Sequence, residues 1–423
     1  MVVSALCVAL ALCLSRSDAA PAAGYVAAAR AQDKNAAGDA AKPPVLNQKV
    51  GKPLQEALKL TQEKKWKDAL AKVEEANTVG EKTPFEVFTI IDFAAYIHAQ
   101  LGDFAKAARA SEAALATGLA PPEQLQARLK ALTQMNYQIK NYAKAIEFGS
   151  RYVKDGDDPD IQILVGQAYF LEGDYASAVA ALKAAVALAE RTKAKIDEDW
   201  LALLMAAQRE LKDGEGVRQT LTRLVRLFPS PRYWDELILM LEKDIPPTEK
   251  LGLDLSRLRM AVGLMTDAAD FMDMAQSAIQ EGLPGEAQAV VEYGYGAAIL
   301  GVTDKDRHFR MLTMATHQAE QDRKSLPQLE TEAKAARTGE ADVKLGEAYW
   351  SHGLSDQAIA AIRRGLAKGG VKNPDKTKLH LGIILLGAGA PAEAEKTWAD
   401  LPPGGDAARI AELWAIVGAG IKS

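Results

Sequence analysis

The 423 residues are 48% hydrophobic and 25% charged, which is too apolar for a disordered chain and too long for one compact core. Aromatic residues make up only 6%, which argues against an all-β sandwich or barrel, whereas the abundant Ala, Leu, Glu, Lys and Gln favour helix. The net charge is −5, with both signs mixed and no basic stripe that carries aromatic residues, so nucleic acid is not an expected partner.

The chain begins with a segment typical of exported proteins. Val2–Leu14 is an apolar run of thirteen residues, which matches a signal-peptide core and falls short of the ~18–20 residues of a membrane span. Small residues follow, and we predict a signal peptide at residues 1–22, removed by cleavage before Ala23. Cleavage after Ala19 and an uncleaved anchor are the alternatives, because the segment lacks a basic start. The mature chain is expected to have no membrane span.

Both cysteines, Cys7 and Cys13, lie inside the predicted signal peptide. Its removal would leave a mature chain without thiols, so disulfides, thiol catalysis and cysteine-bound zinc are not expected. Residues 23–48 are rich in Ala, Pro, Gly and Lys without periodicity, and we interpret them as a flexible linker.

A pattern of small and aromatic residues recurs along residues 49–400. It is clearest where Gly166 is followed by Gly173, Tyr175 and Ala178. Gly173 is expected to end a helix in the left-handed conformation, and Ala178 to be small because the next helix crosses there. The same pattern, which we call the repeat pattern, recurs in seven further stretches: Lys65-Trp66 with Ala69, Gly102-Asp103-Phe104 with Ala107, Asn141-Tyr142 with Ala145, Trp200 to Pro229, Gly282 with Ala287, Gly346 with Gly353, and Gly382 with Gly389.

This pattern resembles the tetratricopeptide repeat, a 34-residue pair of antiparallel helices. The resemblance implies an all-α fold, an α-α superhelix in which helix pairs stack into a solenoid over residues 49–400. An unrelated helical bundle is the alternative. Residues 233–267 and 303–338 lack the signature and are predicted as degenerate pairs, the second one interrupted before Leu326 because Pro327 marks a turn or a helix start. Residues 401–423 are predicted to supply a helix that caps the array.

In tetratricopeptide proteins, the first helix of each pair lines a concave groove that holds a peptide or a partner helix. Side chains carried over to these inward positions are therefore candidate partner-binding residues, although each could instead pack between repeats or lie on solvated surface. A repeated Lys/Arg set that would clamp a terminal carboxylate is not found. The candidates are Asp92, Tyr96, Gln100, Lys130, Gln134, Tyr137, Gln167, Phe170, Gln208, Arg209, Glu347 and Trp350.

Two stretches point to a narrower group. The stretch from Asp199-Trp200 to Tyr233-Trp234 and the stretch from Leu366 to Gly382 resemble periplasmic repeat proteins encoded beside TonB/ExbB-type energy-transducing systems. The resemblance implies a periplasmic scaffold or adaptor that binds other proteins or peptides of the cell envelope. An assembly factor for an outer-membrane or polysaccharide-export complex is the alternative, and a solute binder or enzyme that uses the inner groove is a third hypothesis.

No group of residues has the spacing of an active site, so we expect no catalysis, cofactor or metal. The five histidines include no pair three or four residues apart, and the acidic run Asp155–Asp160 lacks the ligand spacing of a calcium loop. Met260, Met265, Met272 and Met274 are interpreted as core residues, with a pliable binding groove as the alternative.

Overall fold

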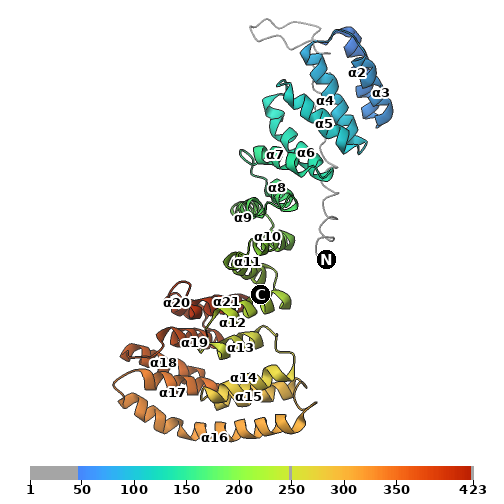
Figure 1. Ribbon diagram of the computed structural model, residues 1–423. Coiled ribbons are helices and arrows are strands. Elements are labelled where there is room, and N and C mark those ends of the chain that lie inside the picture. Colours follow the sequence, from blue (N-terminus) through green and yellow to red (C-terminus); the bar gives the residue numbers. More distant parts are fainter. Residues whose placement is uncertain (1–45, 247–249, 421–423) are drawn as a thin grey trace. The chain divides into compact units, whose positions relative to one another are not determined.

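A computed structural model describes residues 46–246 and 250–420 (Figure 1). Within these ranges the chain forms twenty α-helices and one short 3-10 helix, and no strand. It divides into two compact units, and the boundary between them in the chain falls between Val217 and Arg218. The prediction of an all-α fold built from helix pairs is therefore confirmed. The predicted signal peptide and nearly all of the predicted linker lie outside the described residues.

Unit 1 consists of helix pairs in chain order. Among the first nine helices of the unit, each packs on its neighbour in the chain, both within a pair and between successive pairs. The helices are α2 (Gln48–Gln62), α3 (Trp66–Asn77), α4 (Pro84–Gln100), α5 (Phe104–Ala116), α6 (Leu125–Gln138), α7 (Tyr142–Tyr152), α8 (Pro159–Leu171), α9 (Tyr175–Thr192), α10 (Glu198–Glu210) and α11 (Gly214–Leu227), which crosses the boundary between the units.

All eight stretches that carry the repeat pattern fall on two consecutive helices, and each turn between those helices contains a residue with positive φ. The residue is glycine in five turns and lysine in three, namely Gly102, Gly173, Gly282, Gly353, Gly389, Lys64, Lys140 and Lys212. A left-handed residue ends the first helix and reverses the chain. In three of these turns an aspartate then caps the second helix: Asp103 accepts from the backbone N–H of Lys106, Asp174 from that of Ser177, and Asp213 from that of Gly216.

Small residues allow the two helices of a pair to approach each other. A Cβ atom on Gly166 would lie 2.7 Å from Leu182 Cγ, and one on Gly346 would lie 2.5 Å from Ile362 Cγ1. A Cβ atom on Gly382 would overlap the indole of Trp398. In each pair the glycine faces the residue sixteen positions later, so the spacing of the sequence pattern is also the spacing of the closest helix contact.

Unit 2 also contains helix pairs, namely α14 with α15, α17 with α18 and α19 with α20. Its last helix, α21, packs on α19 and α20 and also on α13 near the start of the unit (Figure 1). Its helices are α12 (Pro231–Asp244), α13 (Gly252–Ala261), α14 (Ala268–Gln280), α15 (Pro284–Gly296), α16 (Lys305–Ala335), α17 (Glu340–Ser351), α18 (Ser355–Lys368), α19 (Pro374–Gly387), α20 (Pro391–Trp398) and α21 (Asp406–Gly420).

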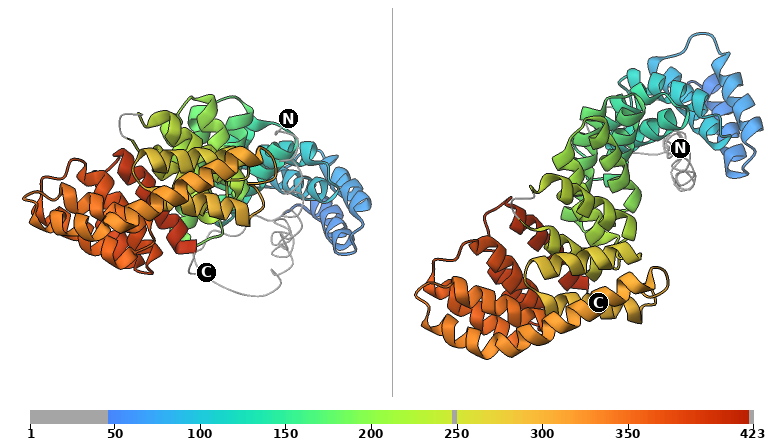
Figure 2. Two further views of the ribbon diagram at one scale, coloured as in Figure 1. Left: turned by 90° about the horizontal axis from the view of Figure 1, so that it is seen from below. Right: turned by 60° about the horizontal axis from the view of Figure 1, so that its bottom comes forward.

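The prediction of a break before Leu326 is wrong, because α16 continues through Pro327 for 31 residues along the edge of unit 2 (Figure 2). Its buried residues recur four or seven positions apart on both sides of the proline: Met311, Ala315, Ala319, Leu326 and Ala333. One uninterrupted apolar stripe packs on α15 and α17. This burial outweighs the backbone hydrogen bond that proline removes. The other degenerate pair is present as α12 and α13.

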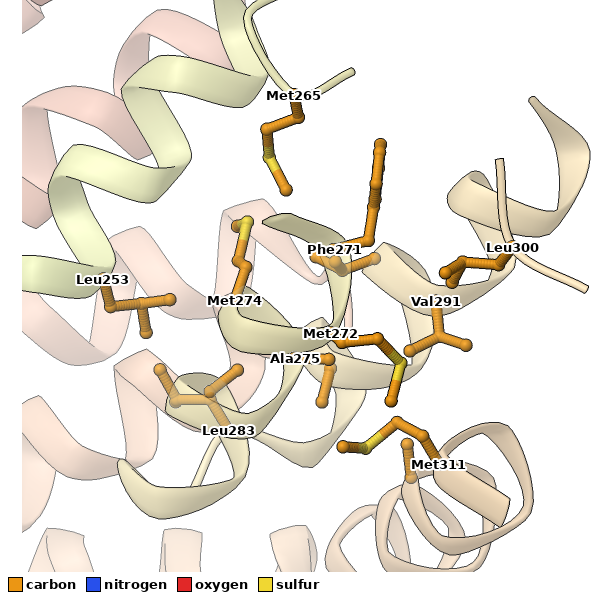
Figure 3. Close-up of a cluster of buried hydrophobic side chains, with 14 residues drawn as sticks. Leu253, Met265, Phe271, Met272, Met274, Ala275, Leu283, Val291, Leu300 and Met311 are labelled. Carbon is orange, nitrogen blue, oxygen red and sulfur yellow. The ribbon is translucent and has the colours of Figure 1, made fainter. Parts of the chain in front are cut away.

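The methionine cluster belongs to the core of unit 2. Met265, Met272 and Met274 are buried together with Phe271, also of α14, and Met311 of α16 (Figure 3). Met260 is partly buried against the same cluster. The flexible thioethers fill the space between α14, α15 and α16, as the core interpretation predicts.

Candidate functional site

The first helices of unit 1 form one layer. α2 contacts α4, α6 contacts α8, and α8 contacts α10, while Arg128 of α6 pairs with Asp92 of α4. The ten candidate residues predicted in unit 1 all lie on the first helices α4, α6, α8 and α10. The layer therefore brings together residues from four consecutive repeats, and the exposure of each one decides what a partner could contact.

Asp92 is buried within this layer. It is 3% exposed and forms a bidentate pair with Arg128 of α6, in which Arg128 Nη2 lies 2.9 Å from Asp92 Oδ2. Gln124 accepts a further bond from Arg128, and the guanidinium lies 5.6 Å from the centre of the Phe88 ring. Asp92 therefore fastens α4 to α6, and its carboxylate is already engaged within the chain.

Lys130 is half-exposed and is also matched within the chain. Its ammonium lies 2.6 Å from Asp158 Oδ2, and the Tyr152 hydroxyl donates to the same oxygen at 3.4 Å. Burial alone would lower the pKa of Lys130, but the hydrogen bond and charge of Asp158 raise it. Asp158 also caps α8 by accepting from the backbone N–H groups of Asp160 and Ile161. The charge of Lys130 is thus balanced at the start of the next repeat.

The three aromatic candidates of unit 1 form edge-to-face pairs between helices. The ring centres of Tyr137 and Tyr142 lie 5.6 Å apart, and those of Phe170 and Tyr175, each 33 positions later, lie 5.3 Å apart. Tyr96 pairs with Trp66 at 6.0 Å. All three candidate rings are half-buried, so each one packs on a neighbouring helix and also presents part of its surface to solvent.

The glutamine candidates differ in exposure. Gln100 is exposed, Gln134 and Gln167 are half-buried, and Gln208 is fully buried within unit 1. Arg209 is exposed, and its Nη2 lies 3.5 Å from Met205 Sδ. The accessible part of the layer is therefore mostly amide and aromatic.

In unit 2, the candidate Glu347 belongs to a largely buried charged cluster, which we define as Asp254, Arg257, Glu286, Glu347 and His380, and the candidate Trp350 packs against it. Arg257 donates to Asp254 at 2.7 Å and to both oxygens of Glu286 at 2.7 Å. His380 lies 2.9 Å from Asp254 through Nε2 and 2.9 Å from Glu347 through Nδ1. The guanidinium of Arg257 lies 4.2 Å from the centre of the Trp350 ring. The cluster joins α13, α15, α17 and α19.

The charges of the cluster shift its pKa values. Burial alone would lower the pKa of His380, but the charge of Asp254 and the hydrogen bonds to Asp254 and Glu347 raise it to about 8. Burial alone would raise the pKa of Asp254, yet the charges of His380 and Arg257 hold it well below its usual range. Burial alone would raise the pKa of Glu347, but the hydrogen bond from His380 and the charges of His380, Lys376 and Arg257 together lower it.

Asp254, Arg257 and His380 were not identified as site residues from the sequence. A signal was nevertheless present, because Leu253-Asp254-Leu255 and Leu379-His380-Leu381 each place an ionisable residue between leucines on a helix. A charge in such an apolar setting needs a partner when it is buried. The partner itself could not be found from the sequence, because it lies 126 positions away.

A cavity of about 240 Å³ lies in unit 2 between the start of α13, the start of α19 and the start of α21. Asp375, Lys376 and Asp406 are among its lining residues. The ammonium of Lys376 already binds the carbonyl of Lys250 at 2.7 Å and Glu281 at 2.9 Å. In the described part of the chain, no three His, Cys, Asp or Glu side chains are placed to hold a metal ion. Nor does any described helix have the length and apolarity needed to cross a membrane.

No protein-family model and no curated protein matches the chain. Among solved structures, the chain is similar to a tetratricopeptide repeat protein from Parabacteroides merdae, with a TM-score of 0.32, 10% identity, and coverage of 80% of this chain and 100% of that one. It is similar to YrrB, described as a TPR protein with an unusual peptide-binding site, with a TM-score of 0.34, 15% identity, and coverage of 43% and 87%. It is also similar to yeast Tom70, with a TM-score of 0.24, 12% identity, and coverage of 88% and 96%. At such scores no residue role and no partner transfers from these structures.

Proposed function

We propose that the chain is an interaction scaffold that binds a protein or peptide of the cell envelope on the first-helix layer of unit 1. One observation carries this proposal. Equivalent positions of α6 and α8 hold an amide and a half-buried aromatic ring, Gln134 with Tyr137 and Gln167 with Phe170. A repeated set of rigid aromatic surfaces and adaptable amides is well suited to binding a polypeptide.

The charges of the layer support a partner of this kind. Asp92 is neutralised by Arg128 and Lys130 by Asp158, so these two acidic and basic candidates are matched within unit 1. A ligand that approaches α4, α6 and α8 therefore meets amide and aromatic groups, because the charged candidates there are already paired within the unit. We therefore expect binding that changes little with ionic strength, in contrast to recognition of a charged tail.

Site-specific photo-crosslinking tests the location of the binding surface. A photoreactive amino acid placed at Gln100, Gln134 or Gln167 is expected to crosslink a partner in intact cells. The matched control is Lys183, an exposed residue of the second helix α9. Crosslinks from Lys183 alone, or from none of the four positions, would contradict the proposal. The identity of the crosslinked protein separates a TonB/ExbB-type system from an outer-membrane or polysaccharide-export complex.

We further propose that the chain is exported to the periplasm. The support is the apolar run Val2–Leu14, followed by small residues, together with the restriction of both cysteines to that segment. The amino-terminal sequence of the protein purified from cells is expected to begin at Ala23. A mature protein that retains Met1 and stays with the cytoplasmic fraction would contradict export.

A further inference from the structure

The two ends of unit 2 are linked by side chains that lie far apart in the sequence. His380 on α19 bonds Asp254 on α13, 126 positions earlier, and Lys376 on α19 bonds the carbonyl of Lys250 just before α13. His380 is 1% exposed and Asp254 is fully buried, so no bulk solvent reaches this link. The contact between α13 and α19 therefore depends on the hydrogen-bonding state of one imidazole.

The surroundings of His380 favour its doubly protonated form. Three carboxylates lie in the cluster, Asp254, Glu286 and Glu347, whereas Arg257 is its only permanent cation. Lys376, on the same helix as His380, is paired with Glu281 outside the cluster, and its charge also acts on Asp254 and Glu347. With a proton on both ring nitrogens, His380 donates to Glu347 and to Asp254 at once, and the excess of negative charge is reduced.

Loss of one proton removes one of these two bonds, because a neutral imidazole has a single N–H. Arg257 Nη1 lies 3.4 Å from His380 Nε2 and can donate to that nitrogen once it is unprotonated. Nδ1 has no such alternative donor among the contacts of the cluster. The proton on Nδ1 therefore stays on the bond to Glu347, and the bond to Asp254 is lost.

We infer that His380 is a pH-dependent latch of unit 2, which in its doubly protonated form holds α19 to α13 and on losing its Nε2 proton releases Asp254. The 2.9 Å bond from His380 to Asp254 is then replaced by the 3.4 Å contact from Arg257, which also lies on α13, so the link between α13 and α19 is weakened. Glu347 and Trp350 are half-buried and border His380, so the change in its bonding reaches two of the predicted partner-binding residues. The latch is a property of unit 2 alone and does not depend on the function proposed for unit 1.

The direction of the pH dependence follows from the pKa of His380, which rises from 6.5 to about 8 in the folded chain. A raised pKa means that the stabilisation is complete below the unfolded value of 6.5 and is lost as pH rises through about 8. The latch is therefore closed at neutral and acidic pH and opens under mildly alkaline conditions.

Trp350 provides a direct reporter, since its ring centre lies 5.3 Å from that of His380. The full chain labelled with 5-fluorotryptophan gives one ¹⁹F NMR signal for each tryptophan, and the signal absent from Trp350→Phe identifies position 350. We expect this signal to titrate with a midpoint near pH 8 and to show no such titration in His380→Gln. The matched control His317→Gln removes an exposed histidine of α16 and is expected to leave the titration unchanged.

Glu347→Gln keeps the inference testable if His380→Gln does not fold. Removing one of the two carboxylates bonded to His380 is expected to lower the midpoint of the Trp350 signal by about one pH unit. The latch is refuted if the Trp350 signal does not titrate between about pH 6.5 and pH 9, the range that spans the shifted histidine. It is also refuted if His380→Gln titrates like the unchanged chain, or if Glu347→Gln leaves the midpoint in place.

Discussion

Units 1 and 2 form charge pairs over different distances along the chain. In unit 1, Arg128 pairs with Asp92, 36 positions away, and Lys130 with Asp158, 28 positions away, so each pair joins neighbouring repeats. In unit 2, His380 and Asp254 are 126 positions apart and join helices near opposite ends of the unit. The same type of helix pair therefore supports either a stack held by contacts between neighbours or a closed arrangement held by a distant contact.

The distance matters because the free-energy cost of ordering the chain depends on it. A contact between neighbouring repeats closes a loop of one repeat, and its formation helps the next repeat to add. A contact across 126 positions forms only after the helices between have packed, and it must overcome a larger loop-closure entropy. We therefore expect changes in the charged cluster to act on unit 2 as a whole.

The largest effect is expected from Arg257→Met. This change leaves Glu286 without its cation and Asp254 with His380 alone, and breaking a buried ion pair costs about 3–5 kcal/mol. Hydrogen exchange measured by mass spectrometry should show reduced protection in α13, α15 and α19. Arg259→Met on the same helix is the control, because Arg259 pairs with the more exposed Asp235 and Glu242, and it should change stability by less than about 1 kcal/mol. Equal effects of the two changes would show that the charged cluster contributes no more to stability than the exposed ion pairs of Arg259.

Gly382→Ala tests the close helix contact within a unit 2 pair. The new Cβ atom would overlap the rigid indole of Trp398, and overpacking of this kind costs about 1–3 kcal/mol of unfolding free energy. Gly166→Ala in unit 1 meets Leu182, whose flexible side chain can move, so its effect should be smaller. Gly387→Ala on the same helix as Gly382 meets no atom within 4 Å and should be neutral or stabilising in urea unfolding.

The pH dependence of stability should separate the units. The shift of the His380 pKa from 6.5 to about 8 corresponds to about 2 kcal/mol of stability in unit 2, present below pH 6.5 and lost as pH rises past 8. Exchange rates of unit 2 peptides, corrected for intrinsic base catalysis, should reveal this loss. The peptides of α6 to α9 in unit 1 serve as the internal control. An equal loss in both units would assign the pH dependence to something other than His380.

The smallest effect is expected at the contact between repeats in unit 1. Asp158→Ala removes the cap of α8 and the partner of Lys130, and a lost cap costs about 1 kcal/mol. Lys130→Met removes a half-exposed partner and should cost about 0.5 kcal/mol or less. Thermal unfolding followed by circular dichroism can rank the two. A larger loss for Lys130→Met would mean that its charge, and not the cap, holds the two repeats together.

The sequence by itself determined the helix pairs of this protein. Their signals are local: a left-handed residue ends the first helix, as at Gly173, and a small residue sixteen positions before a bulky one sets the contact, as at Gly166 and Leu182. The same local sequence pattern also assigned the unit 1 candidates to first helices. It was wrong at Pro327, where the apolar stripe of α16 packs on neighbouring helices strongly enough to carry the helix through.

Only the tertiary structure decided which side chains meet. The sequence could not show that Asp92 is buried against Arg128, or that Glu347 and Trp350 lie beside His380 and Arg257. These partners come from different repeats, and the position of one repeat relative to another follows from packing summed over all the helices between them. A local sequence pattern does not predict how these packing contacts add up over many helices. For this reason the closure of unit 2 is visible only in the folded chain.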